Sequence, residues 1–221
     1  MTRVLVTFAT GPFTELLSIA RPGFEEYADR HGYELRTAPP AMLTRPASWG
    51  KVSRLLDALD VYSEALWIDC DVVMLDTSVD LADEVPPEAW HAITMLHTRE
   101  GEIPSCGVWL CRQPMRRPLE QIWSLTRYLH HPWWEQAALH HALGYGGQPV
   151  ALQNPTELLA RTYWLGGEWN ALRLQFPDPE TEEFDEPRFA HCGPGSSVGF
   201  RAGLMRDLTA RAELAHTTEG A

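Results

Sequence analysis

Two carboxylates, Asp69 and Asp71, interrupt an otherwise apolar stretch at residues 65–75 (Ala-Leu-Trp-Ile-Asp-Cys-Asp-Val-Val-Met-Leu). An apolar run of this length is typical of a strand that is buried on both faces of a parallel sheet. Because an unpaired carboxylate is costly to bury, we expect both aspartates at the end of that strand, where the chain leaves the sheet. Residues two apart in an extended segment point the same way, so the two carboxylates would face one point and suit a hard cation. Two solvated acids at a strand end would give the same pattern, so the neighbouring elements have to decide.

The elements before this stretch predict a parallel α/β sheet. Residues 3–9 and 33–36 have the composition of strands, and a helix is expected between them, broken at Pro22-Gly23. Apolar residues at helical spacing predict a second helix over 48–59 (Val52, Leu55, Leu56, Leu59). The resulting order, strand–helix–strand–helix–strand, is typical of a parallel sheet covered by helices.

The second half of the chain is less regular, with short apolar pieces separated by Pro, Gly and Asn. Two further strands and three helices are expected at residues 91–97 and 106–111, and at 118–129, 132–143 and 203–214. No repeat or composition shift marks a boundary, so residues 1–221 are interpreted as a single α/β domain.

Composition excludes some partners. The chain has 18 basic and 30 acidic residues, a net charge of −12, which argues against nucleic acid or an anionic membrane surface as a partner. If the protein handles phosphates, a metal ion is therefore expected. No apolar run is long enough for a transmembrane segment, and the four cysteines form no Cys-x-x-Cys pair. We expect a cytoplasmic protein with free thiols.

Ligands of open α/β sheets bind beyond the carboxyl ends of the strands. There, Thr7, Ala9 and Thr10 would hold a nucleotide, while the segment from Asp69 through Cys70 to Asp71 would hold its diphosphate through a metal. Lys51 opens the helix before the acidic strand, and it is either a cation for the phosphates or a solvated surface lysine.

Six short segments together resemble glycosyltransferases of the GT-A fold that use nucleotide-sugars. The likeness is closest to glycosyltransferase family 34, the galactosyl-, mannosyl- and xylosyltransferases, and weaker to the glycogenin-like family 8. The segments are residues 27–33 (Tyr-Ala-Asp-Arg-His-Gly-Tyr), 49–51 (Trp-Gly-Lys), 67–71 (Trp-Ile-Asp-Cys-Asp), 106–112 (Cys-Gly-Val-Trp-Leu-Cys-Arg), 134–139 (Trp-Glu-Gln-Ala-Ala-Leu) and 189–193 (Phe-Ala-His-Cys-Gly). The resemblance implies a Rossmann-like, mostly parallel sheet flanked by helices, with a smaller irregular region on the acceptor side. About residues 1–100 would form the nucleotide-sugar half, and about 101–215 the acceptor and catalytic half.

The resemblance also implies a metal centre. Asp69 and Asp71 would bind Mn²⁺ or Mg²⁺, with His191 as the third protein ligand. Imidazole is a poor partner for Mg²⁺, so the histidine favours Mn²⁺. A nucleotide-sugar would be the donor, a UDP-sugar rather than a GDP-sugar, and a sugar or another small hydroxyl compound would be the acceptor.

Glu135 and Gln136 would lie against the donor sugar. Enzymes of the resembled families retain the anomeric configuration of the donor sugar. Adjacent residues of a helix point about 100° apart, so the two side chains cannot both face the sugar. We expect Gln136 to face the sugar, which leaves no good nucleophile and predicts departure and attack on the same face. Aromatic residues are frequent here, and at most two of them are expected to contact an acceptor (Trp133, Trp134, Tyr163, Trp164, Trp169).

The chain departs from the family pattern at two places. Ser105 stands where the family has an asparagine that contacts the donor sugar, two residues before Gly107, which is also assigned to the donor site. The late lysine of the family is missing. The Gly-rich segment that starts at Gly193 follows instead, and it could offer backbone amides to an anion. Arg201 is the first cation after it.

Two other readings share these residues. The segment 68–73 also matches the haloacid-dehalogenase phosphatases, in which Asp69 would be a nucleophile and Asp71 a general acid/base with Mg²⁺. That fold normally begins with its acidic strand, whereas here a complete βαβα unit precedes it. The second alternative is a sugar-nucleotide-binding or carbohydrate-binding module without turnover.

Overall fold

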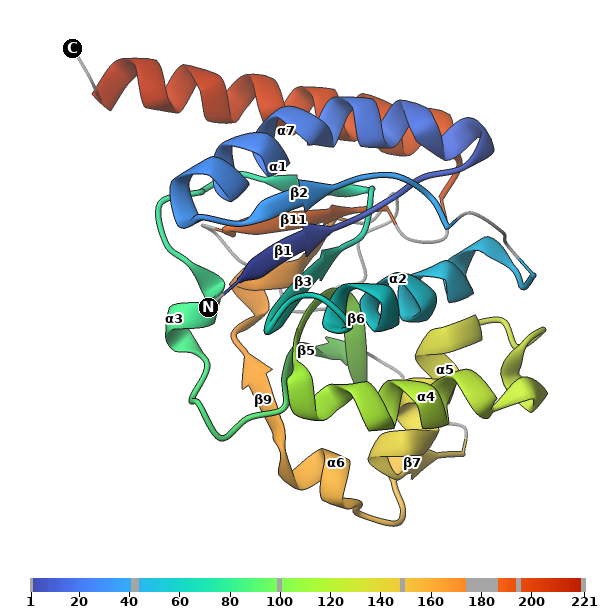
Figure 1. Cartoon of the computed structure of the whole chain (residues 1–221). Coiled ribbons are helices and arrows are strands. Elements are labelled where there is room, and N and C mark those ends of the chain that lie inside the picture. Colours follow the sequence, from blue (N-terminus) through green and yellow to red (C-terminus); the bar gives the residue numbers. More distant parts are fainter. Residues whose placement is uncertain are drawn as a thin grey trace.

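A six-stranded sheet in the order β2-β1-β3-β6-β5-β9 forms the centre of the computed structural model (Figure 1). The structure describes residues 2–40, 44–98, 101–147, 150–173, 187–193 and 196–219. The strands are β1 (Arg3–Val6), β2 (Glu34–Arg36), β3 (Glu64–Ile68), β5 (His91–Thr98), β6 (Gly101–Arg112) and β9 (Thr162–Leu165). Every strand except β6 runs in the same direction, which confirms the mostly parallel α/β sheet.

Apolar side chains fill both faces of this sheet, as a parallel strand between two helix layers requires. In β1, Leu5 points to one core while Val4 and Val6 point to the other, because successive side chains of a strand alternate. The same alternation separates Leu66 from Trp67 in β3.

The helices α1 (Thr14–His31) and α7 (Val198–Glu219) lie side by side over one face of the sheet (Figure 1). The predicted break at Pro22 is wrong, since α1 is continuous across it. Proline removes the bond to the carbonyl of Ser18, and both residues lie on the exposed side of the helix, where water can bond that carbonyl. The final helix begins at Val198, before the predicted residue 203.

The other face is covered by α2 (Gly50–Leu59), α4 (Arg116–Ser124) and α5 (Trp134–Leu143). Gly144 ends α5 at φ 98°, a left-handed conformation that glycine adopts without strain, and the helix thus ends at the predicted residue 143.

A second sheet of three strands, in the order β10-β11-β4, joins distant parts of the chain: β10 (Ala171–Arg173), β11 (Phe189–Cys192) and β4 (Val72–Met74). Residues 65–75 are therefore two strands of different sheets, not one, and the aspartates lie in the turn between them. The break occurs at Asp69, whose amide bonds to Gly107 of the first sheet, whereas His191 of β11 pairs with Val72.

The remaining elements are short. They are the helices α3 (Leu81–Glu84) and α6 (Glu157–Ala160), the strands β7 (Tyr145–Gly146) and β8 (Ala151–Leu152), and several 3₁₀ turns, among them Gly167–Asn170. No helix of the described residues combines the length and apolarity needed to cross a membrane. All four cysteines are free thiols.

Candidate active site

Two carboxylates and an imidazole meet at the carboxyl end of β3. Asp69 and Asp71 lie in the turn after β3, closed by a bond from the amide of Val72 to the carbonyl of Asp69 at 3.1 Å. His191 comes from β11 in the neighbouring sheet. One ligand atom of each residue lies within 4.8 Å of the others. The expectation that the aspartates face one point holds, although a turn and not an extended strand brings them together.

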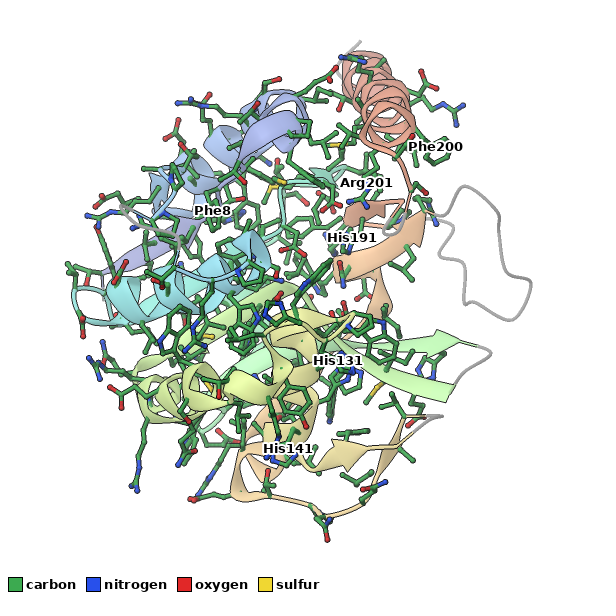
Figure 2. All side chains as sticks on the ribbon, turned by 90° about the vertical axis from the view of Figure 1, so that its right-hand side faces the viewer. Phe8, His131, His141, His191, Phe200 and Arg201 are labelled. Atoms are coloured by element: carbon green, nitrogen blue, oxygen red, sulfur yellow. The ribbon has the colours of Figure 1, made fainter. Side chains whose placement is uncertain are left out.

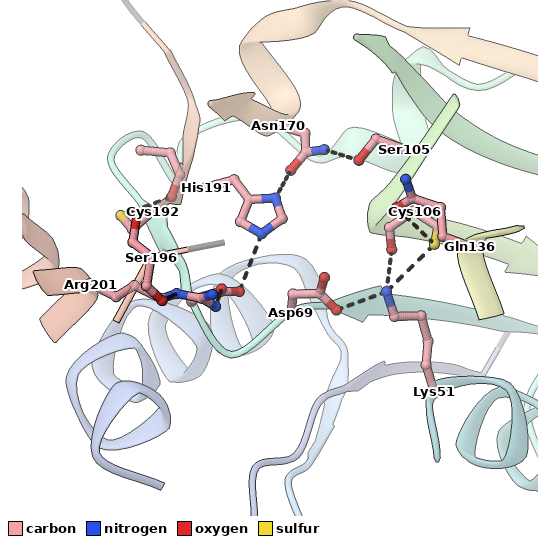
Figure 3. A network of polar contacts seen from close by, with 12 residues as sticks. Lys51, Asp69, Ser105, Cys106, Gln136, Asn170, His191, Cys192, Ser196 and Arg201 are labelled. Atoms are coloured by element: carbon pink, nitrogen blue, oxygen red, sulfur yellow. Dashed lines mark hydrogen bonds and ion pairs between the residues drawn. The ribbon is translucent and has the colours of Figure 1, made fainter. Parts of the chain in front are cut away.

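Asp71 is buried, and both of its oxygens have partners. Oδ1 lies 3.3 Å from Nε2 of His191, and Oδ2 lies 2.6 Å from Nη1 of Arg201 (Figure 3). Burial alone raises the pKa of this carboxyl, but the charges of His191 and Arg201 outweigh burial and lower the pKa to about 2. Asp71 is therefore ionised, as a metal ligand must be.

His191 is held on both sides of its ring. Nδ1 lies 3.1 Å from Oδ1 of Asn170, while Nε2 faces Asp71 (Figure 3). Burial lowers the pKa of His191, but the adjacent Asp71 carboxylate raises it further, so that the net direction is upward. Gly107 lies against the ring, since a Cβ atom there would be 2.8 Å from Nδ1.

These donors fit a divalent cation. Two carboxylates and one imidazole within chelating distance suit Mn²⁺ better than Mg²⁺, which prefers oxygen ligands. Nε2 of His191 faces Asp71, while its other ring nitrogen has a polar partner, as is usual for metal-bound histidines. Trp67 donates from Nε1 to Oδ1 of Asp69 at 2.6 Å, which restricts how that carboxylate can turn.

Lys51 lies on the first turn of α2 and is only 5% exposed, so the solvated-lysine interpretation is wrong. Its Nζ is 2.9 Å from Oδ1 of Asp69 and 3.4 Å from Oε1 of Glu135, and it donates to the carbonyl of Cys106 at 3.0 Å. Burial lowers the pKa of Lys51, but the surrounding carboxylates raise it well above its usual value. The ammonium therefore stays charged and joins the two carboxylates.

Glu135 and Gln136 open α5 beside this lysine. Glu135 is 6% exposed, and burial raises its pKa even though Lys51 opposes the change. The preceding residue, Trp134, has φ 40°, a strained left-handed conformation for a bulky side chain. Trp134 is nevertheless the first residue of α5, directly before these two side chains.

A cavity of about 800 Å³ contains this group of residues. Figure 2 shows His191 and Arg201 on neighbouring elements of that region. Ten residues predicted for the site line the cavity: Ala9, Thr10, Lys51, Asp69, Cys70, Asp71, Glu135, Gln136, His191 and Arg201.

Four predicted donor-binding residues are not among the described residues that line the cavity. Thr7 is completely buried, and Ser105 is 3% exposed and bonded to Asn170. Gly107 packs under His191. Gly193 has φ 60°, and residues 194–195 of the predicted anion-binding segment lie outside the described residues.

Two of the five aromatic residues considered for an acceptor line the cavity, Trp133 and Trp134. Trp169 is completely buried, and Tyr163 and Trp164 pack against the two cores.

Sequence reasoning missed Asn170. Its side chain is completely buried and connects His191 with Ser105 and Thr94. A lone asparagine between Trp169 and Ala171 carries no local signal of such a role.

No known family model matches the chain, and no curated protein matches it in sequence. Solved structures do resemble it. A glycosyltransferase involved in glycosylation of the major capsid of PBCV-1 is 15% identical, with 93% of this chain and 99% of that chain covered and a TM-score of 0.66. The galactosyltransferase LgtC is 13% identical, with 95% of both chains covered and a TM-score of 0.60. Mouse xyloside xylosyltransferase 1 is 10% identical, with 89% and 99% covered and a TM-score of 0.52.

These similarities establish the GT-A fold that the sequence motifs predicted. They give no support to the haloacid-dehalogenase alternative. At this level of identity they show the fold alone, and activity has to be argued from the site.

Proposed function

We propose that this chain is a metal-dependent glycosyltransferase that moves a sugar from a nucleotide-sugar donor to a hydroxyl acceptor. The observation that carries the proposal is the convergence of Asp69, Asp71 and His191 in one cavity with Glu135 and Gln136. The fold likeness supports it, since LgtC is a galactosyltransferase crystallised with donor and acceptor sugar analogues. An active-site glutamine of LgtC has also been replaced by glutamate in a further structure.

In this proposal the donor spans the cavity. Its nucleoside lies near Ala9 and Thr10, and its diphosphate lies near the acidic turn. A bound Mn²⁺ would neutralise the negative charge of the leaving diphosphate. Arg201 also lines the cavity, with Nη1 2.6 Å from Oδ2 of Asp71, and it would supply the positive charge of the lysine missing from the family pattern. Among the possible donors, we favour a UDP-sugar over a GDP-sugar.

The family resemblance implies retention of configuration, and the state of Glu135 decides between the two routes by which retention is reached. A covalent glycosyl intermediate needs a free carboxylate, but Glu135 is buried and paired with Lys51 at 3.4 Å. Gln136 is an amide and a poor nucleophile. We therefore assign attack to the face from which the diphosphate leaves: the bond to the leaving oxygen breaks, the acceptor oxygen bonds to the same carbon, and the leaving phosphate takes the acceptor proton.

The acceptor is placed beside Trp133 and Trp134. Both line the cavity next to Glu135. Trp134 is 45% exposed, although contact of so large an apolar side chain with water is unfavourable. Sugar rings stack their apolar faces on such side chains, so a sugar acceptor suits this rim better than a charged one.

The first test is thermal unfolding with UDP-, GDP- and dTDP-sugars, each with and without Mn²⁺. A nucleotide at a hundred times its dissociation constant should stabilise the protein by about 2.7 kcal/mol. The proposal fails if no nucleotide gives a metal-dependent shift. A labelled donor then separates an enzyme from a binding module, since only an enzyme releases or transfers the sugar. NMR of the product, made from a donor of known anomeric form, tests retention.

A further inference from the structure

Asn170 ends the 3₁₀ turn Gly167–Asn170, and its side chain lies between His191 and Ser105 (Figure 3), with the hydroxyl of Thr94 also in contact. Oδ1 is 3.1 Å from Nδ1 of His191, while Nδ2 is 3.0 Å from Oγ1 of Thr94 and 2.9 Å from Oγ of Ser105. All four side chains are buried. Water therefore has little access to these groups, and each must be satisfied by its protein neighbours.

The two ends of the amide differ chemically. The amide nitrogen only donates, and its two hydrogens have two acceptors in the hydroxyls of Thr94 and Ser105. The amide oxygen only accepts, so Nδ1 of His191 must carry the proton that it shares with Asn170. A histidine must be neutral to bind a metal, and with its one remaining proton on Nδ1 the electron pair is on Nε2, the atom that faces Asp71.

Gly107 completes this arrangement. A Cβ atom at this position would lie 2.8 Å from Cε1 and Nδ1 of His191 and 3.0 Å from Oδ1 of Asn170. The ring and the amide thus both pack against the backbone of β6 at Gly107, and this close approach fixes the plane of both.

We infer that Asn170 is a positioning residue: it keeps the His191 proton on Nδ1, so that Nε2 serves as the electron-pair donor to a divalent cation. Thr94 and Ser105 hold the amide in the required orientation, and either hydroxyl alone is enough to hold it. Ser105 thereby orients the metal ligand and does not contact the donor sugar. The inference concerns the cation alone, so it can hold or fail independently of sugar transfer.

The test compares Asn170→Leu with Asn170→Asp in the full chain without nucleotide. The leucine has a similar shape but no polar atoms, and it should weaken Mn²⁺ binding, measured by electron paramagnetic resonance, by about 10–100-fold. The aspartate still accepts the Nδ1 proton while the two hydroxyls turn to donate, so it should keep most of the affinity.

The hydroxyls provide a second test. Thr94→Val and Ser105→Ala each leave one acceptor for the amide, and each should change Mn²⁺ affinity little. The double variant leaves none, and its loss should approach that of Asn170→Leu. Two losses that simply add would contradict the shared role, because redundant groups give non-additive effects.

The proton itself is visible by ¹⁵N NMR of the histidine rings, with His191→Gln used to assign the signal. At alkaline pH, where the ring is neutral, the inference requires the Nδ1–H form in the wild type, and it is overturned if the single proton lies on Nε2, as it would with a reversed amide. It is also overturned if Asn170→Leu folds and binds Mn²⁺ as the wild type does. If Asn170→Leu does not fold, the double hydroxyl variant and the NMR signal decide. A protein that shows the Nδ1–H form and binds Mn²⁺ but uses no nucleotide-sugar would refute the proposed function and keep this inference.

Discussion

Nζ of Lys51 lies 2.9 Å from Oδ1 of Asp69, and it comes from the helix that leads into the strand ending at that aspartate. The same ammonium reaches Glu135 at 3.4 Å. One buried charge thus ties the metal-side carboxylate to the carboxylate expected beside the sugar. Lys51 and Glu135 are both buried, so each needs a charged partner in place of water, and Asp69 adds a second carboxylate to the ammonium.

Replacing Lys51 with methionine should therefore destabilise the protein strongly. The change keeps the length of the side chain but leaves Glu135 and Asp69 without their shared cation. Removing one partner of a buried ion pair costs about 3–5 kcal/mol. Urea unfolding at pH 7 measures the loss. Arg30→Met is the control, since Arg30 pairs with Glu26 at the surface, where both side chains are about half exposed and the pair is worth about 1 kcal/mol or less. Equal losses in the two variants would contradict the buried role of Lys51.

Asp69→Asn and Asp71→Asn should each weaken Mn²⁺ binding. An amide is a weaker ligand than a carboxylate, and a loss of at least about 10–100-fold is expected, since disturbing the surroundings of a bound metal already costs that much. Titration of Mn²⁺ followed by electron paramagnetic resonance gives the affinities. Asp57→Asn, an exposed change on α2, should leave the affinity unaltered. Wild-type affinity in both site variants would make the acidic turn purely structural.

Gly107→Ala should harm both the fold and the metal site. The new Cβ atom would press on the His191 ring at 2.8 Å, and overpacking of this kind costs about 1–3 kcal/mol. The displaced ring should also lower Mn²⁺ affinity. Gly203→Ala in α7 is the matched control, because a Cβ atom there meets nothing within 4 Å and should stabilise the helix by about 0.4–1 kcal/mol. Thermal unfolding of the pair, with and without Mn²⁺, would show whether the close approach matters.

His91 should make the protein less stable in mild acid. It accepts from Nε1 of Trp109 at Nδ1 and donates from Nε2 to Thr162, and burial lowers its pKa to about 3 from the ordinary 6.5. The folded pKa is depressed, so the stabilising contribution is complete above pH 6.5 and is lost as the pH falls toward 3. A group that takes up one proton only on unfolding changes the free energy of unfolding by about 1.4 kcal/mol per pH unit.

Urea unfolding between pH 7.5 and 5, for the wild type and for His91→Gln, measures this dependence. Glutamine can still accept and donate a hydrogen bond but does not titrate, so the difference between the two slopes belongs to His91. Identical slopes would show that folding does not lower the pKa of His91.

Two substitutions at Trp134 separate the effect of its backbone strain from the effect of its ring contacts. Trp134→Gly removes the ring and relieves φ 40°, whereas Trp134→Ala removes the ring and keeps the strain. The glycine variant should be the more stable by about 1 kcal/mol. If the ring holds the acceptor, both variants should lose transfer to acceptor while still binding nucleotide with Mn²⁺. Unchanged transfer in both would remove Trp134 from the acceptor site.

The fold could be predicted from the first third of the chain because β1 and β3 lie between two helix layers, so their residues are almost all apolar. Asp69 and Asp71 could be identified for the same reason, as charges that such a strand cannot bury. The turn that separates β3 from β4 could not, since Val72 and Val73 read as a continuation of the strand. The role of Asn170 could not be predicted from the sequence, because it depends on Thr94 and Ser105, which only the folded chain brings beside it.

The pairing of β4 with β11 also has a kinetic consequence. His191 stands opposite Val72, so this one register sets the distance between ligands from distant parts of the chain. A shift by one residue would turn His191 to the opposite face of the sheet. Pairings between distant segments carry a large loop-closure cost and slow folding. During refolding the chain should therefore regain its helices before it regains Mn²⁺ affinity. Recovery of Mn²⁺ binding would then mark the moment at which β11 pairs with β4.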